Sequence, residues 1–150
     1  NAAMGIARLR RDGFASMDAG DGIGTLTTRP LMFTRGSHLF VNADAAGGEL
    51  RVEIAAADGA PLAGFGADDC EPLRADSTLH AVAWRGRPTL NALRDRPVRF
   101  RFHLTRGRLF AFWVSGSDGS SSGFLAGGGP GYASLRDMQG IAALRSFLFP

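Results

Sequence analysis

The sequence predicts an all-β protein: an antiparallel β-sandwich of the jelly-roll or concanavalin-like kind, with a short helix at its C-terminal end. Strand-like segments recur at short spacing along most of the chain. Turn residues such as Gly, Pro, Asn and Asp separate them. No parallel βαβ unit is visible, so a sandwich is favoured over an α/β fold.

The strand-like segments comprise about nine or ten strands and cover residues 5–10, 14–19, 26–34, 38–42, 49–56, 61–65, 79–84 and 98–114. Asp12-Gly13 suits a hairpin turn between the first two segments. Pro30 indicates an edge position or a bulge in the third segment, because proline cannot donate to a strand ladder. Residues 89–94 can hold one helical turn, which Pro97 ends.

Residues 98–114 (VRFRFHLTRGRLFAFWV) predict a hairpin with its turn at Arg106-Gly107. The first half alternates between apolar and polar residues, which is typical of a strand with one dry and one wet face. The second half is apolar without a break from Leu109 to Val114, so both faces of the return strand need cover.

A hairpin loop with an even number of residues would place Phe100 opposite Trp113 and Phe102 opposite Ala111 on the core face. The opposite face would then carry five residues that we identify as a candidate ligand-binding set: Arg99, Arg101, His103, Phe110 and Phe112. Arginine forks bind hydroxyl pairs and carboxylates, and aromatic rings offer flat apolar surface to a sugar ring. A three-residue loop would dissolve this arrangement, because a one-residue slip moves every side chain to the other face.

The alternative, which the sequence favours over ligand binding, is that another strand, a neighbouring domain or the C-terminal helix covers this face. The rings are phenylalanines, whereas sugar platforms favour tryptophan and tyrosine. Tyr132 is the only tyrosine, and Trp113 is predicted to point inward.

Residues 1–132 are predicted to form the sandwich module, including a Gly/Ser-rich connection at 115–131. The connection does not match a phosphate-binding loop, because the chain contains no lysine. Residues 133–150 form an amphipathic helix or an appended tail. Apolar residues recur through 133–149 at helical spacing, and this helix could pack on the sandwich or on a second copy of the chain: Leu135, Met138, Ile141, Leu144 and Leu148.

Composition narrows the classes of partner and cofactor. The 150 residues carry a net charge of +3, and the 17 basic residues, all arginine, are spread among acids, so nucleic acid is not expected as a partner. No apolar run is long enough for a membrane span. Cys70 is the single cysteine, which excludes an internal disulfide and a cysteine-based metal cage.

No cofactor or metal is expected. The three histidines, His38, His80 and His103, lie on separate predicted strands without metal-ligand spacing. A structural Ca²⁺ is conceivable from acids such as Asp68-Asp69, but turn and cap roles are favoured.

The sequence favours a non-catalytic role over an enzymatic one, and no catalytic residue is assigned. Glycoside cleavage requires two acids across a cleft, one of them with a raised pKa. Glu53 is the one acid within the central strands, where it alternates with Val52 and Ile54 and is therefore expected to face solvent. No Gly-x-Ser-x-Gly elbow is present.

Four segments carry a resemblance to a known family: GIARLRRDGFAS (residues 5–16), LTTRPL (26–31), LFVN (39–42) and PVRFRF (97–102). With them, most of the chain up to Tyr132 resembles the C-terminal β-sandwich region of large bacterial glycoside-hydrolase-like proteins. In those proteins a β-propeller related to sucrose- and fructan-cleaving enzymes precedes the sandwich and holds the catalytic acids. The resemblance implies no catalytic residue here, and the ending 133–150 departs from the family pattern.

Three functions follow as expectations. The first is an accessory module of a carbohydrate-active protein that binds a polysaccharide on one sheet face. The second is a structural or oligomerisation domain that rests on a neighbouring catalytic domain or on a second copy through residues 133–149. The third is a small glycan-cleaving enzyme. The family resemblance favours an extracellular or periplasmic location.

Overall fold

The computed structural model describes residues 4–11 and 13–119. The expected helix at 133–149, its role in self-association, and most of the connection at 115–131 lie outside the described residues. The domain boundary at residue 132 therefore stays a prediction.

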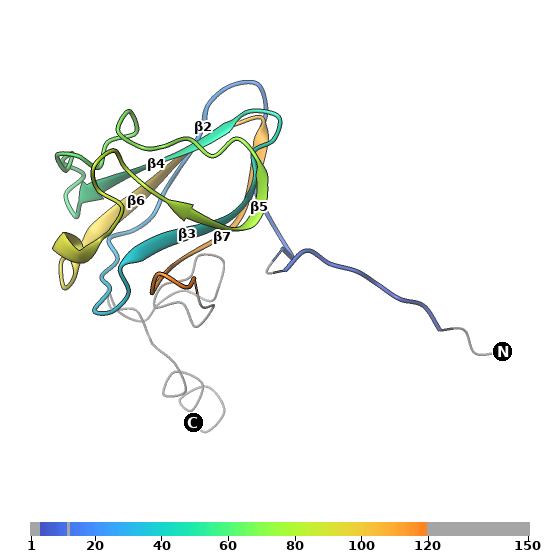
Figure 1. Ribbon diagram of the computed structural model, residues 1–150. Coiled ribbons are helices and arrows are strands. Elements are labelled where there is room, and N and C mark those ends of the chain that lie inside the picture. The colour runs from blue at the N-terminus through green and yellow to red at the C-terminus, as the bar shows by residue number, and fades with distance from the viewer. Residues whose placement is uncertain (1–3, 12, 120–150) are drawn as a thin grey trace.

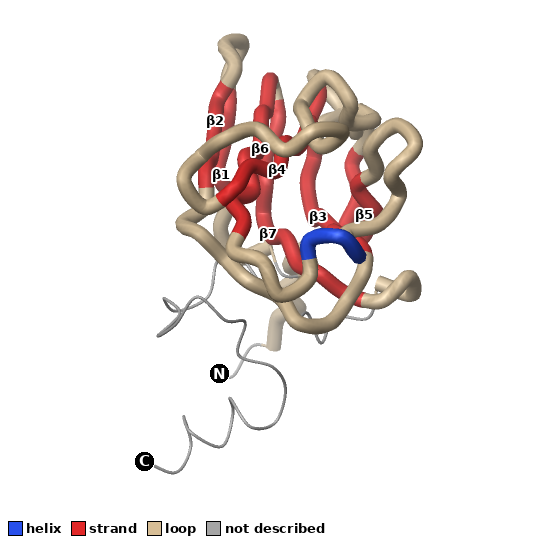
Figure 2. The backbone as a smooth tube through the Cα atoms, turned by 90° about the vertical axis from the view of Figure 1, so that its left-hand side faces the viewer, coloured by secondary structure: helices blue, strands red, loops and turns tan. Residues whose placement is uncertain are grey.

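Two antiparallel sheets pack face to face, as the two layers in Figures 1 and 2 show. One sheet has four strands in the order β1 (Met17–Ala19), β7 (Gly107–Ser115), β3 (His38–Asp44) and β5 (Asp76–Val82). The other has three strands in the order β2 (Gly24–Thr27), β6 (Val98–Thr105) and β4 (Glu49–Ala56). The predicted all-β sandwich is confirmed.

The core lies between the sheets and is filled by alternate residues of the central strands. In β6 buried and half-buried residues alternate along the whole strand, as the period-2 pattern predicts. Phe100 and Phe102 project from β6 against the ring of Phe112 on β7, with ring centroids 6.0 and 4.8 Å apart. This aromatic cluster joins the two sheets.

Several predicted strands differ from the observed elements. Residues 49–56 coincide with β4, but only Met17–Ala19 of residues 14–19 forms a strand. Residues 5–10 form no strand, so the predicted Asp12-Gly13 hairpin is wrong. Residues 61–65 contribute only an isolated bridge from Pro61 to Ala55, beside the outer edge of β4.

The predicted hairpin at residues 98–114 is also wrong. β6 pairs with β2 and β4, whereas β7 pairs with β1 and β3, so the two strands belong to different sheets. Arg106 alone links them, with a positive φ of 42° and its backbone N–H bonded to the carbonyl of Gly20 at 2.8 Å. The physical reason is that the two strands need different surroundings. β6 has one apolar and one polar face, whereas β7 is apolar on both faces, so they belong to different layers.

The four-stranded sheet has apolar residues on both of its faces. Leu39 and Val41 of β3 point into the core, whereas Phe40 lies on the outer face and stacks on Trp113 of β7 at 5.8 Å. Phe40 and Trp113 are both buried. The unbroken apolar run of β7 thus supplies side chains to both faces of its sheet, the core face and the outer face.

The predicted helical turn is observed as a 3-10 turn, η1 (Asn91–Leu93), blue in Figure 2. The amide of Leu90 donates to Ser37 O at 2.7 Å, so this turn is tied to the start of β3. Leu93 is buried in the core.

Candidate functional site

The outer face of the three-stranded sheet carries three of the five predicted binding residues. Arg99, Arg101 and His103 alternate along β6 with buried Phe100 and Phe102, so all three point away from the core. β4 and β2 extend this surface on either side. We call it the polar face, and it comprises Thr25, Thr27, Glu49, Arg51, Glu53, Arg99, Arg101, His103 and Thr105.

The strand register arranges the polar face in rows that cross all three strands. His103 lies between Thr25 and Arg51 in one row, and Arg101 lies between Thr27 and Glu53 in the next; these partners are directly opposite in the ladders. Neighbouring strands are about 4.8 Å apart, so each row forms a continuous line of polar groups.

Glu53 is the centre of the polar face. Arg101 Nη1 donates to Glu53 Oε1 at 3.0 Å, and His103 Nε2 lies 3.2 Å from Glu53 Oε2. The Glu53 side chain is only 15% exposed, against 32% for Arg101 and 26% for His103. One carboxylate thus holds a guanidinium and an imidazole side by side on a flat surface.

Arg99 lies one row further along β6 and is held by the backbone. Its Nε donates to the carbonyl of Ala57 at 2.8 Å and its Nη1 to that of Thr28 at 3.1 Å. Two fixed carbonyls orient the guanidinium, so Arg99 adds positive charge at a defined place on the polar face.

Phe112 does not belong to this surface, and its predicted position is wrong. It lies in the core against Phe100 and Phe102, 6% exposed. The prediction assumed that β6 and β7 share a ladder. Because they face each other from opposite sheets, Phe112 meets the inner face of β6 instead.

Phe110 lies on the other sheet, so its predicted place beside the arginines of β6 is also wrong. A register shift in the β3–β7 ladder falls between Asn42 and Ala43. The guanidinium carbons of Arg10 and Arg108 lie 4.6 and 5.7 Å from the centre of the Phe110 ring. The structure therefore divides the five predicted residues among three places.

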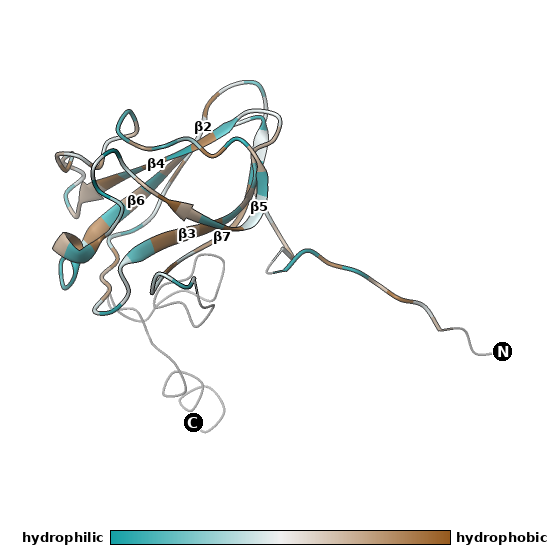
Figure 3. Cartoon of the chain, viewed as in Figure 1, coloured by the Kyte–Doolittle hydropathy of each residue, from teal (hydrophilic) through white to brown (hydrophobic). Residues whose placement is uncertain are grey.

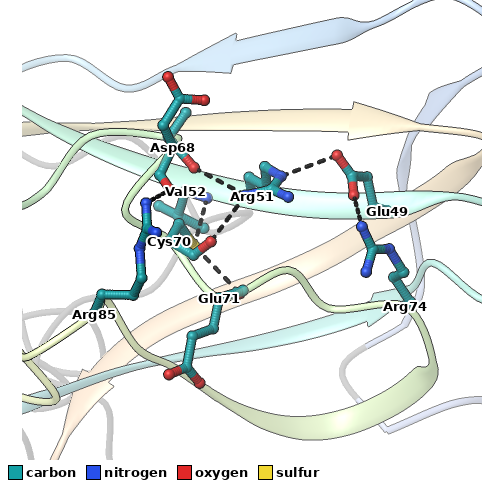
Figure 4. A network of polar contacts seen from close by, with 9 residues as sticks. Glu49, Arg51, Val52, Asp68, Cys70, Glu71, Arg74 and Arg85 are labelled. Carbon is teal, nitrogen blue, oxygen red and sulfur yellow. Dashed lines mark hydrogen bonds and ion pairs between the residues drawn. The ribbon is translucent and has the colours of Figure 1, made fainter.

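A second polar network joins Glu49 and Arg51 of the polar face to the loop around Cys70 (Figure 4). Arg51 Nε donates to Glu49 Oε1 at 3.0 Å, and Arg74 Nη2 donates to Glu49 Oε2 at 2.8 Å. Arg51 Nη1 also donates to the carbonyl of Cys70 at 3.0 Å, and the amide of Val52 donates to Cys70 Sγ at 3.2 Å. These bonds fasten the loop around Cys70 to the outer edge of β4.

Two pKa values in this network are displaced. Hydrogen bonding from Arg51 holds the pKa of Glu49 below its usual value, and Arg74 adds to the effect. Burial raises the pKa of the Cys70 thiol, so the sulfur stays protonated and serves as a packing group at neutral pH.

Sequence reasoning placed Glu53 on the solvent side of β4 but missed its two partners. The alternation in β4 and β6 indicates that Glu53, Arg101 and His103 all face outward. It does not indicate that the two strands are neighbours, and the interpretation of residues 98–114 as one hairpin gave β6 a different partner. Sequence reasoning also missed the contact of Arg10 with Asn42, whose side chain is buried on the outer face of the other sheet.

Among the described residues, no group of three or more His, Cys, Asp or Glu side chains converges on a metal site. Within the same residues no helix has the length and apolar character to cross a membrane. No family model, curated protein or solved structure matches the chain.

Proposed function

We propose that the chain is a non-catalytic accessory β-sandwich of a carbohydrate-active protein, and that the polar face holds an acidic polysaccharide. The observation that carries this is the Glu53 cluster, in which a carboxylate orders Arg101 and His103 on one flat surface. The resemblance to sandwiches that follow glycoside-hydrolase propellers supplies the class of protein.

The cluster suits hydroxyl groups because hydrogen-bond donors and acceptors lie beside one another in it. A carboxylate has about four acceptor positions, and Glu53 uses one on each oxygen for Arg101 and His103. The exposed hydroxyls of Thr25 and Thr27 flank the cluster. Because the charged groups are already ordered, a ligand loses less affinity to side-chain ordering.

The charge balance of the polar face favours an acidic ligand over a neutral one. Three strand arginines, Arg51, Arg99 and Arg101, face two glutamates, Glu49 and Glu53, which leaves one positive charge in excess when His103 is neutral. The planar guanidinium fork binds carboxylate and sulfate groups through two parallel hydrogen bonds. Uronic-acid or sulfated polymers therefore fit better than uncharged ones.

The two acids of the polar face argue for holding over cutting. Glycoside cleavage needs one carboxylic acid with a raised pKa, whereas the pKa of Glu49 is lowered by Arg51. Glu53 accepts from a guanidinium and lies within bonding distance of an imidazole. Both glutamates lie on a sheet face and are already engaged: Glu53 by Arg101 and His103 of the neighbouring strand, and Glu49 by Arg51 of its own strand and by Arg74.

Affinity gel electrophoresis tests this function with polygalacturonate and with neutral dextran as probes. We expect the wild-type chain to be retarded by polygalacturonate more than by dextran, and less so at high salt, because surface charge interactions are screened. Arg101→Ala should weaken retardation about tenfold or more, as the loss of a charged hydrogen bond does.

The matched control is Arg108→Ala. Arg108 is also an arginine on an outer sheet face and donates to a carboxylate, Asp44, at 2.8 Å, but it lies on the four-stranded sheet. Equal loss of binding in the Arg108 and Arg101 variants, or equal retardation by both polymers, contradicts the proposal. Release of reducing ends from either polymer by the purified chain would instead support the enzymatic alternative.

A structural role without a ligand is the second candidate, and one observation favours it. Phe14, Met17 and Ile23 are 85, 57 and 73% exposed near the edge formed by β1 and β2. Such a group of large apolar side chains is typical of a surface that meets protein.

A further inference from the structure

The sandwich opens between its edge strands β1 and β2. Two adjoining cavities, of about 130 and 170 Å³, lie there and share Met17, Leu26 and Leu109 in their walls. Their deeper walls include Phe102 and Phe112 from the core. We call this apolar feature the β1–β2 groove.

The same chain carries an apolar segment outside the body of the sandwich. Residues 4–9, the N-terminal arm, run away from the sheets in Figure 1, and Figure 3 marks apolar stretches along them. Met4 and Ile6 are fully exposed, and Leu9 is 66% exposed. Most of the surface of these three side chains therefore faces solvent.

The root of the arm is fixed. Arg10 donates to Asn42 Oδ1 at 2.6 Å, forms an ion pair with Asp76 and lies over the Phe110 ring. The amide of Gly13 donates to the carbonyl of Arg10 at 3.1 Å, which closes a turn directly after the root. The arm therefore projects from an anchored position on the four-stranded sheet.

We propose that the N-terminal arm of one copy occupies the β1–β2 groove of a second copy, and that the exchange is reciprocal. The groove adjoins the polar face at Thr25, which lines one of the cavities, but the oligomeric state tests this proposal without any polysaccharide. An isologous dimer of this kind is the commonest symmetric assembly.

A second copy fits better than the arm of the same chain. Residues 10–16 lie between the arm and β1, and the cavity wall already includes Ala15 and Ser16 from this stretch. With Arg10 anchored and the turn to Gly13 closed, the arm would have to reverse over its own root to enter its own groove.

Charge and periodicity agree with this occupant. In an extended arm Met4, Ile6 and Arg8 share one side. The apolar pair can face the groove walls, and Arg8 can approach Asp18, which lines one of the two cavities.

Analytical ultracentrifugation over a range of concentrations tests the proposal. We expect the wild-type chain to dimerise reversibly, and both the arm variant Met4→Ser/Ile6→Ser and the groove variant Met17→Arg to be monomeric. All three positions are more than half exposed, so these changes leave the core intact. Leu79→Arg, at an exposed residue of β5, is the matched control and should dimerise like wild type.

Mixing the two monomeric variants distinguishes arm exchange from general apolar association. The groove variant still has an intact arm, and the arm variant still has an intact groove, so their mixture should form a heterodimer weaker than the wild-type dimer. A dimer with a Kd in the micromolar range is formed at about 100 µM protein, so a wild-type chain that stays monomeric at that concentration would overturn the proposal. Persistent dimers in both variants, or no heterodimer in the mixture, would overturn it equally.

Discussion

At the scale of the residue, the positions of Phe110 and Phe112 are the sharpest difference between expectation and structure. The two rings are two positions apart in one strand, yet one lies under guanidinium groups on an outer face and the other in the core. Removing a buried phenylalanine ring loses transfer free energy and leaves a cavity.

We therefore predict that Phe112→Ala lowers the free energy of unfolding by about 3–5 kcal/mol, and that Phe110→Ala lowers it by clearly less because the ring is only half buried. Urea denaturation followed by tryptophan fluorescence measures both. Equal losses would mean that the two rings share one environment.

At the scale of the element, the ladder between β3 and β7 ends at an ion pair between Asp44 and Arg108. Arg108 hydrogen-bonds to Asp44 and, with help from the amide of Ala46, keeps the pKa of Asp44 below its usual value. A carboxyl whose pKa is lower in the folded state adds stability above its unfolded pKa, near 4. That stability is lost as the pH falls through the lower, folded pKa.

We therefore predict that the difference in Tm between wild type and Arg108→Ala is larger at about pH 6 than at about pH 2. Arg85→Ala is the control. Arg85 also pairs with a carboxylate, that of Asp69 at 3.8 Å, but Asp69 lies in a loop and not in a strand ladder. Differential scanning calorimetry at the two pH values measures the shift. A difference that does not change with pH would assign the loss to the contact between the Arg108 guanidinium and the Phe110 ring.

The elements also show what the sequence could and could not predict. Alternation along β4 and β6 predicted which side chains face the core, because period 2 is a local property of a strand. Pairing partners are not local. Arg106 connects two sheets with a single residue, so the turn signal at Arg106-Gly107 suggested a hairpin that does not exist.

The candidate site was likewise predictable in the direction of its side chains but not in which of them meet. The outward direction of Arg101 and His103 was predictable, whereas their meeting at Glu53, about 50 residues earlier, depends on the ladder between β4 and β6. The arm was predicted as a strand because its pattern is strand-like, and a pattern alone does not supply a neighbour to pair with.

At the scale of the whole molecule, Cys70 reports on the opening of the sandwich. Cys70 is 3% exposed, its sulfur accepts a hydrogen bond from the amide of Val52 in β4, and burial raises the pKa of its thiol. Thiol reagents attack the thiolate, so a buried protonated thiol reacts only after the structure opens.

We predict that Cys70 is inert to Ellman's reagent in the folded chain at pH 7.5 and reacts fully in denaturing urea. At intermediate urea the labelling rate should follow the unfolded fraction seen by fluorescence. Rapid labelling of the folded chain without urea would show that the loop around Cys70 detaches from β4 by itself.

The place of β7 in the fold has a consequence for synthesis. β7 is the last described strand in the chain, yet it lies between β1 and β3 in its sheet. A nascent chain that has not yet released residues 107–115 from the ribosome can assemble β2, β6 and β4, but β1 has no neighbour. Until that strand arrives, Phe100 and Phe102 of β6 lack the ring of Phe112 that they contact in the core, and apolar surface exposed in this way during folding favours aggregation.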